Sequence, residues 1–180
     1  MRKKLRRWEI AGFLFTAAMG PLLHFAFKWS GYSSLVGAFA AVNESTWEHM
    51  KILFVPLFVF TILEFLVFAE SYTNFFAAKG ASALAALAGI PVLYYTINGA
   101  FGKTPDFINI AIYYVAAIAF FLLSFFLLTR GCLRGGRWQV GAFVLFWLLA
   151  FLFVYFTYRP LPLPLFTDPR TGTVGMVRQA

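Results

Sequence analysis

Cysteine and acidic residues are scarce in this sequence, and the usual catalytic motifs are missing. Cys132 is the single cysteine among 180 residues, so no disulfide can form within the chain. It lies beside Arg130 and Arg134 in an expected loop, which favours the reducing side of a membrane. The sequence has no HExxH, CxxC or HxxxH spacing and no glycine-rich phosphate loop. The common motifs of zinc and nucleotide sites are therefore excluded, and no serine has a plausible His and Asp partner set.

Charge is scarce as well, because charged residues make up 12% of the chain and hydrophobic residues 61%. A soluble domain contains about 45–50% apolar residues, so this composition predicts an integral membrane protein embedded in a lipid bilayer. The net charge of +8 would suggest a polyanionic partner in a soluble protein. Here the basic residues lie between apolar runs, where they set the orientation of the chain, and nucleic-acid binding is not expected.

Five apolar runs approach or exceed the ~20 residues that a helix needs to cross a bilayer. They cover residues 8–28, 51–70, 80–102, 107–129 and 138–158. The first could be a signal peptide cleaved after Ala38-Phe39-Ala40. However, it is longer than the roughly 7–15 apolar residues of a signal peptide, and Ala40 lies well beyond its end. We therefore predict a retained helix and an all-α integral membrane protein, one domain of residues 1–180 with five transmembrane helices.

The basic residues also predict an orientation. Most of the fifteen lie in the N-terminal segment or in loops on the same side, with Lys79 assigned to the loop between the second and third helices. The positive-inside rule then favours an N-in, C-out topology with an extracytoplasmic tail, residues 159–180. Residues 29–41 are expected to form an interfacial or re-entrant segment. The proline–leucine alternation of residues 160–165 predicts an extended tail, either loose or packed over the outer mouth.

The most polar run, residues 42–51 (VNESTWEHMK), falls at the outer start of the second helix in this topology. Ser45 and Glu48 fit the S-x-x-E capping box, in which two side chains satisfy backbone donors at a helix start. Capping does not account for the other polar side chains of the run, which leaves room for a binding site. The candidate ligand-binding residues are Asn43, Glu44, Trp47, Glu48, His49, Asn98 and Asp106.

Carboxylates and imidazoles at one place suit a divalent metal ion. The candidate metal ligands are His24, Glu48 and His49, with Glu44 and Asp106 as further candidates. Glu48 and His49 are adjacent and point about 100° apart on a helix, so other segments would have to supply ligands. A histidine such as His24 near a helix end is also typical of a hydrogen-bonded interface residue.

A second hypothesis is ion or proton movement, because ionisable residues in membrane segments often mark pathways. Glu64 follows His49 by fifteen residues. This separation corresponds to about 60° of net rotation, so both residues lie roughly along one side of the second helix. Glu64 is also close enough to the end of its helix for a structural role.

Several of these motifs resemble a known group of proteins. His24-Phe25, Trp29-Ser30-Gly31, the N-E-S-x-W-E-H run from Asn43 to His49, and Pro56 are similar to the signature of small prokaryotic membrane proteins grouped as a domain of unknown function. The tail from Pro164 to Thr173 resembles the end of the same group. The resemblance spans most of the chain and implies one unit in a prokaryotic cytoplasmic membrane, but no activity, cofactor or partner.

Three functions stay open from the sequence. The leading hypothesis is a membrane protein that binds a cation or small ligand at its outer side, in a transporter-like role. The second is a metal-dependent membrane enzyme that acts on a lipid-like substrate. The third is a non-catalytic assembly partner, which would associate with a second copy or another membrane protein. It would use the tail and a ridge of small residues on the third helix, Ala81, Ala85 and Gly89 with Ser82 and Ala86 alongside.

Overall fold

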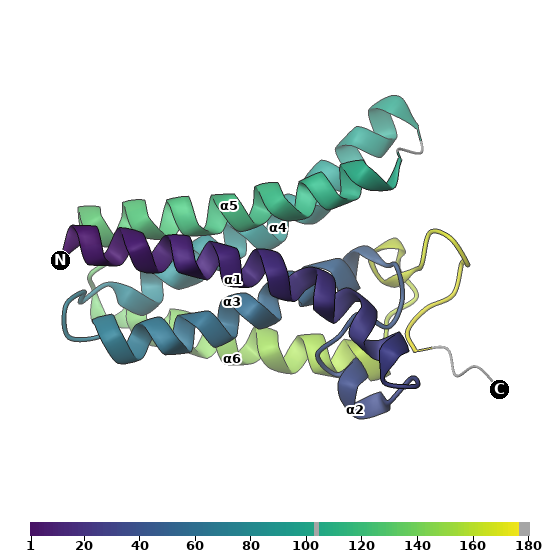
Figure 1. The fold of residues 1–180 in the computed structure, drawn as a ribbon, viewed down its shortest axis with the longest axis horizontal. Helices are drawn as coiled ribbons and strands as arrows, with labels where there is room; N and C mark the ends of the chain where they lie inside the picture. Colours follow the sequence, from purple (N-terminus) through teal and green to yellow (C-terminus); the bar gives the residue numbers. More distant parts are fainter. Residues whose placement is uncertain (103–104, 177–180) are drawn as a thin grey trace.

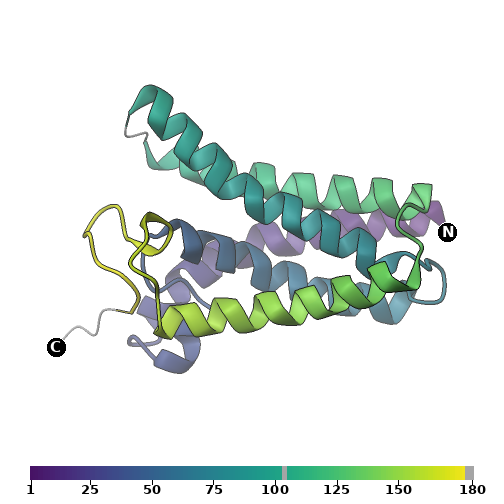
Figure 2. The same cartoon turned by 180° about the vertical axis from the view of Figure 1, so that it is seen from behind.

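The computed structural model describes residues 1–102 and 105–176, which form an all-helical structure (Figures 1 and 2). In chain order the helices are α1 (Arg2–Trp29), α2 (Ser34–Gly37), α3 (Thr46–Phe68), α4 (Phe75–Phe101), α5 (Asp106–Arg130), α6 (Gly136–Tyr158) and the 3₁₀ turn η1 (Pro164–Phe166). Within these ranges the β pairing is limited to an isolated antiparallel bridge between Thr167 and Val174.

Helices α1, α3, α4, α5 and α6 are long and apolar enough to cross a membrane, which confirms the predicted number of such helices and indicates a multi-pass membrane protein. They run along the long axis of the molecule, with the N-terminus at one end and the C-terminal tail at the other (Figure 1). We call these the N-terminal end and the tail end. Helix α1 packs against α3 and α5, whereas α4 packs against α3, α5 and α6.

Helix α1 approaches its neighbours closely because its inward face carries glycine. A side chain at Gly12 would overlap the rings of Phe60 on α3 and Phe121 on α5, and one at Gly20 would overlap the hydroxyl of Tyr113. The same face buries Glu9 near the N-terminal end of the helix. The glycines thus bring the few polar groups of α1 into direct contact with α3 and α5.

Helix α4 begins at Phe75 instead of residue 80, and this corrects the position of Lys79. Asn74, at the N-cap, donates hydrogen bonds to the carbonyls of Leu127 and Cys132, each at 2.8 Å, which ties the start of α4 to the end of α5. Lys79 was assigned to a loop because a lysine interrupts the apolar pattern. It lies inside α4 and is fully buried, because ion pairs replace its contact with water.

The small-residue ridge predicted for α4 is buried on one side. Ser82 and Ala86 of that ridge are buried, whereas Ala85 is exposed and Ala81 and Gly89 are partly buried. The buried small residues are Ala78, Ser82 and Ala86 on the adjacent face, and Gly80 allows close contact with α6. A Cβ at Gly80 would lie 2.8 Å from the Cβ of Ala142. The sequence shows two adjacent stripes of small residues that look alike. The positions of the neighbouring helices decide which of the two stripes is buried.

The tail end is where the bundle opens. The last turns of α4 and the first turns of α5 lean away from the other helices, and the C-terminal tail folds back over this end (Figures 1 and 2). The segment between α1 and α3, which includes α2, lies at the same end (Figure 1). The described part of the tail is anchored, because Phe166 of η1 is buried against Trp47 at a ring separation of 4.9 Å.

Candidate functional site

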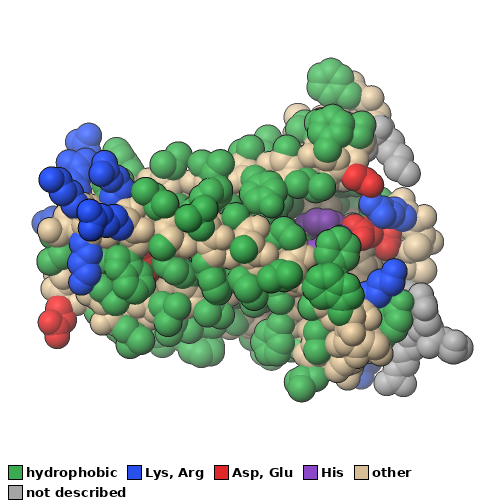
Figure 3. Space-filling model, in the orientation of Figure 1, with side chains coloured by type: hydrophobic (Ala, Val, Ile, Leu, Met, Phe, Trp, Pro, Cys, Tyr) green, Lys and Arg blue, Asp and Glu red, His purple; other side chains and the backbone are tan. Residues whose placement is uncertain are grey.

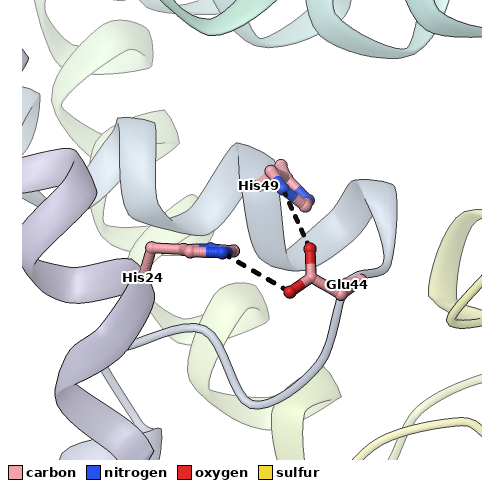
Figure 4. Close-up of side chains that lie close together, drawn as sticks. All are labelled: His24, Glu44 and His49. Atoms are coloured by element: carbon pink, nitrogen blue, oxygen red, sulfur yellow. Dashed lines mark ion pairs between the residues drawn. The ribbon is translucent and has the colours of Figure 1, made fainter. Parts of the chain in front are cut away.

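Three ligand-type side chains meet at the tail end. His24 comes from α1, Glu44 from the loop before α3, and His49 from the first turns of α3 (Figure 4). One potential ligand atom from each residue lies within 4.8 Å of the other two. We call these three residues the histidine cluster. Each is partly buried, so the cluster lies below the surface without being sealed from it.

The separations in the histidine cluster are close to those of ligands that share one ion. His24 Nε2 lies 3.4 Å from Glu44 Oε1, and His49 Nε2 lies 3.8 Å from Glu44 Oε2. Two ligands about 2.0–2.1 Å from a tetrahedral zinc ion would lie roughly 3.3 Å apart. A small inward movement of the side chains is therefore enough to place all three around a single cation.

The backbone orients the imidazole of His49. Its Nδ1 lies 2.9 Å from the carbonyl oxygen of Ser45, so Nδ1 carries the proton and donates to that oxygen. Nε2 then presents a lone pair towards Glu44. Metal-binding histidines are commonly fixed in this way, with one ring nitrogen bonded to a carbonyl and the other free to bind the ion.

The C-terminal tail holds Glu44 in place. The backbone amide of Glu44 donates to Asp168 Oδ2 at 3.2 Å, and the other oxygen of the buried Asp168 accepts from the amides of Arg170 and Thr171. The hydrogen bond with His24 holds the pKa of Glu44 below its ordinary value, against the opposing effect of burial. Glu44 is therefore an ionised acceptor between two imidazoles at neutral pH.

A cavity of about 370 Å³ adjoins the histidine cluster. Glu44 and His49 line it together with residues of α4, α5 and the tail. The remaining lining residues are Thr46, Ile90, Tyr94, Tyr95, Asn98, Asp106, Asn109, Ile112, Tyr113, Pro169 and Arg170. Two isoleucines and three tyrosines thus face amides and charged groups in one cavity. Such a lining suits a small ligand with both an apolar part and a polar part.

The polar groups of this cavity come from segments distant in sequence. Asp106 Oδ2 accepts a hydrogen bond from Arg170 at 2.9 Å, and both side chains are largely exposed. Asn98, which also lines the cavity, donates to the carbonyl of Tyr94 at 2.8 Å. Figure 3 shows acidic, basic and histidine side chains gathered at this end of the molecule, beyond a broad apolar band.

Glu48 lies outside the histidine cluster, although the sequence made it a candidate metal ligand. It is buried and pairs with Lys51 at 2.6 Å, and it accepts from the amide of Val42 at 3.0 Å. Lys51 is fully buried and also donates to the Gly37 carbonyl and Thr157 Oγ1. Glu44 takes the place suggested for Glu48, since Glu48 is turned away from the histidines and contacts Lys51 and Thr157 of α6.

The rest of the polar run forms the support of the site. Ser45 caps α3 by accepting from the amide of Glu48 at 3.4 Å, but Glu48 does not return the bond of a capping box. Instead, the amide of Ser45 donates to Asn43 Oδ1, and Asn43 Nδ2 donates to the Gly175 carbonyl in the tail. Trp47 packs between Phe153 and Phe166 and does not line the cavity.

Several lining residues were missed from the sequence. Asn109 and Tyr113 are four residues apart and share one face of α5, and Arg170 comes from the tail. Asn109, a polar residue in an otherwise apolar helix, was the signal in the sequence that could have identified this face of α5. Nothing local to Arg170 could have placed it beside Asp106, since that pairing depends on how the tail folds back.

A second group of charged residues lies away from the histidine cluster. Lys79 of α4 pairs with Glu9 of α1 at 3.1 Å and with Glu64 of α3, and Ser124 of α5 donates to Glu9 at 2.7 Å. All four side chains are at most 5% exposed. We call these four residues the buried ionic centre. Glu64, although near the end of its helix, is completely enclosed.

Comparison with known proteins identifies the family of this chain. Residues 1–176 match the family described as "Family of unknown function (DUF6512)", and the chain belongs to that family. No curated protein and no solved structure matches the chain. The match covers both the histidine cluster and the buried ionic centre, so both belong to the matched region.

Proposed function

We propose that the histidine cluster binds a divalent transition-metal ion through His24 Nε2, the Glu44 carboxylate and His49 Nε2. The observation that carries this proposal is the convergence of these atoms to within 4.8 Å, with His49 already oriented by Ser45. Two imidazoles and one carboxylate form a ligand set that zinc uses when a fourth position stays open for water or a ligand. Zn²⁺ is accordingly the ion we assign to the site.

We further propose that the tail end faces the outside of a cell membrane. The N-terminal end carries the exposed residues Arg2, Lys3, Lys4, Arg6 and Arg7. Arg130 ends α5, Arg134 lies in the loop after it, and Arg137 lies in the first turn of α6. Figure 3 shows a group of basic side chains at the N-terminal end, separated from the histidine side by the apolar band. The positive-inside rule places such an end in the cytoplasm, so the histidine cluster lies near the outer leaflet.

The adjoining cavity supports a second candidate function, a metal-dependent enzyme that acts on a lipid-like substrate. Glu44 and His49 face the same cavity as Ile90, Ile112 and Asn98, so a ligand there could contact apolar side chains and reach the metal. A metal with an open position can activate a water molecule or polarise a carbonyl or phosphoryl oxygen. Both candidate functions require metal binding by the histidine cluster, so metal binding is tested first.

Elemental analysis and calorimetric titration with Zn²⁺ on the purified, detergent-solubilised protein test the metal proposal. We expect one zinc per chain in the wild type and its loss in Glu44→Gln and His49→Ala. The loss in affinity should exceed the roughly 10–100-fold that removal of a residue supporting a ligand costs.

Asp106→Asn is the matched control, because Asp106 lines the same cavity but lies outside the histidine cluster. It should bind zinc like the wild type. A wild-type protein without zinc affinity, or an Asp106→Asn variant as impaired as Glu44→Gln, would overturn the assignment.

A further inference from the structure

The buried ionic centre contains one more acid than base. Glu9 and Glu64 supply two carboxylates and Lys79 a single ammonium, and Ser124 adds a neutral hydroxyl. If all three charged groups were ionised, the centre would hold a net charge of −1 at sites that are at most 5% exposed. An uncompensated charge buried in protein costs several kcal/mol, and the group takes up a proton instead.

Lys79 is held in its charged form by its surroundings. Its Nζ contacts both carboxylates and lies 5.4–5.9 Å from the ring centroids of Phe75, Phe120 and Phe121. Aromatic faces attract a cation, and most strongly where water is excluded. The extra proton therefore belongs to one of the two acids.

The hydrogen bonds distinguish the two acids. Glu9 Oε1 accepts from Lys79 at 3.1 Å and from Ser124 at 2.7 Å, while its Oε2 has no hydrogen-bond partner among the described residues. The two bonds to Oε1 favour the ionised form of Glu9. Glu64 contacts Lys79, but its Oε1 is buried and has no hydrogen-bond partner among the described residues. Each acid thus has one oxygen without a donor, but Glu9 receives a second hydrogen bond, from Ser124, that Glu64 lacks. Glu64 is therefore the better place for the proton.

Few other titratable groups face this centre. Tyr72, in the loop after α3, has its pKa raised first by burial and then by the charge of Glu9, while Arg2 acts in the opposite direction. Arg6 lies with Glu9 along an apolar groove between α1 and α5, and its side chain is exposed. Exposed arginines are screened by water, so they do not replace the missing counter-charge in the interior.

We propose that the buried ionic centre is a proton-binding site that keeps one exchangeable proton on Glu64 at neutral pH. Release of this proton leaves two carboxylates with one ammonium, and its uptake restores neutrality. The site is separate from the histidine cluster and does not depend on a metal. It gives the protein a group that can take up and release a proton inside its helical bundle, as proton-linked membrane proteins require.

Infrared spectroscopy of the purified protein in detergent, titrated with acid and base, tests this proposal. A protonated carboxyl has a C=O stretching band that a carboxylate lacks. We expect this band at neutral pH in the wild type and its loss in Glu64→Gln. Glu9→Gln should lose it too, because one carboxylate and Lys79 then balance. Glu70→Gln, at an exposed glutamate, is the control and should keep the band.

Two further measurements assign the proton and identify the bound cation. In Ser124→Ala the band should keep its position, since Ser124 contacts Glu9 and not Glu64. A shifted band in Ser124→Ala would assign the proton to Glu9 instead of Glu64. The titration is repeated without sodium, and a band that appears only then would make the centre a sodium site. Absence of the band at neutral pH with and without sodium, or its survival in Glu64→Gln, would overturn the proposal.

Discussion

The histidine cluster and the buried ionic centre both include residues of α1 and α3, but they differ in access to water. Glu9 and His24 lie fifteen residues apart on α1, and His49 and Glu64 lie fifteen residues apart on α3. At 1.5 Å per residue, each pair spans about 22 Å along its helix. The histidine cluster adjoins a cavity, whereas the side chains of the buried ionic centre are enclosed.

This difference decides what each group of charges can do. Around the cavity, imidazoles and a carboxylate keep partial contact with solvent, so an ion or ligand can enter without unfolding the bundle. In the buried ionic centre, aromatic rings and neighbouring helices enclose the ammonium, and a proton is the ligand that we propose there. The comparison teaches that access to solvent separates a group of side chains open to an ion or ligand from one closed around its own charges.

The largest expected effect comes from removing the cation of the buried ionic centre. Lys79→Ala leaves Glu9 and Glu64 buried without an ammonium, and breaking a buried ion pair in this way costs about 3–5 kcal/mol. Thermal unfolding in detergent should show this loss. Lys28→Ala, at an exposed lysine near the end of α1, is the control and should stay within about 0.5 kcal/mol of the wild type. Equal effects at the two lysines would remove the distinction between enclosed and accessible charges.

Zinc should stabilise the tail end by an amount set by mass action. At a free concentration of about 100 times Kd, binding to the folded state adds about 2.7 kcal/mol to the free energy of unfolding. The wild type should therefore unfold at a higher temperature with zinc, whereas His49→Ala should not respond. Glu64→Gln should respond like the wild type, because the buried ionic centre takes no part in zinc binding. If the change in unfolding temperature with zinc depended on Glu64, the two sites would not be independent.

A smaller effect is expected from acid on the metal-free protein. The pKa of Glu44 is lowered in the folded state, so its stabilising contacts are present above its ordinary pKa and are lost as pH falls through the lowered value. We expect the wild type to lose at most about 1 kcal/mol more than Glu44→Gln over this acidic range, because the side chain is partly exposed. Unfolding curves of both proteins from neutral to acidic pH measure this difference, and parallel curves would contradict it.

The smallest effect is expected at the rim of the cavity. Asp106 and Arg170 form an ion pair at 2.9 Å, but their side chains are 73% and 52% exposed. Surface pairs of this kind contribute about 0–1 kcal/mol, and salt weakens them further. Asp106→Asn should therefore change the unfolding temperature very little. A large loss would mean that the tail is held at this rim more than by Trp47 and Asp168.

The polar run from Asn43 to Lys51 illustrates how far the sequence could go. Its place at the start of an apolar helix and the capping role of Ser45 follow from local spacing, and both were predicted. Which carboxylate joins the histidines was not, because Glu44 and Glu48 differ only in the direction they face. That direction depends on α6, which supplies Thr157 beside Glu48, and on the tail, which supplies Asp168 beside Glu44.

The sequence by itself determined that five helices are long and apolar enough to cross a membrane, because this requires only the length and composition of each run. It also determined that ionisable groups are few and that two of them, His49 and Glu64, share one side of α3. Only the tertiary structure decided that Lys79 joins Glu9 and Glu64, and that His24 meets Glu44. These contacts join segments far apart in the chain, and packing around residues such as Gly12 sets how closely the helices approach.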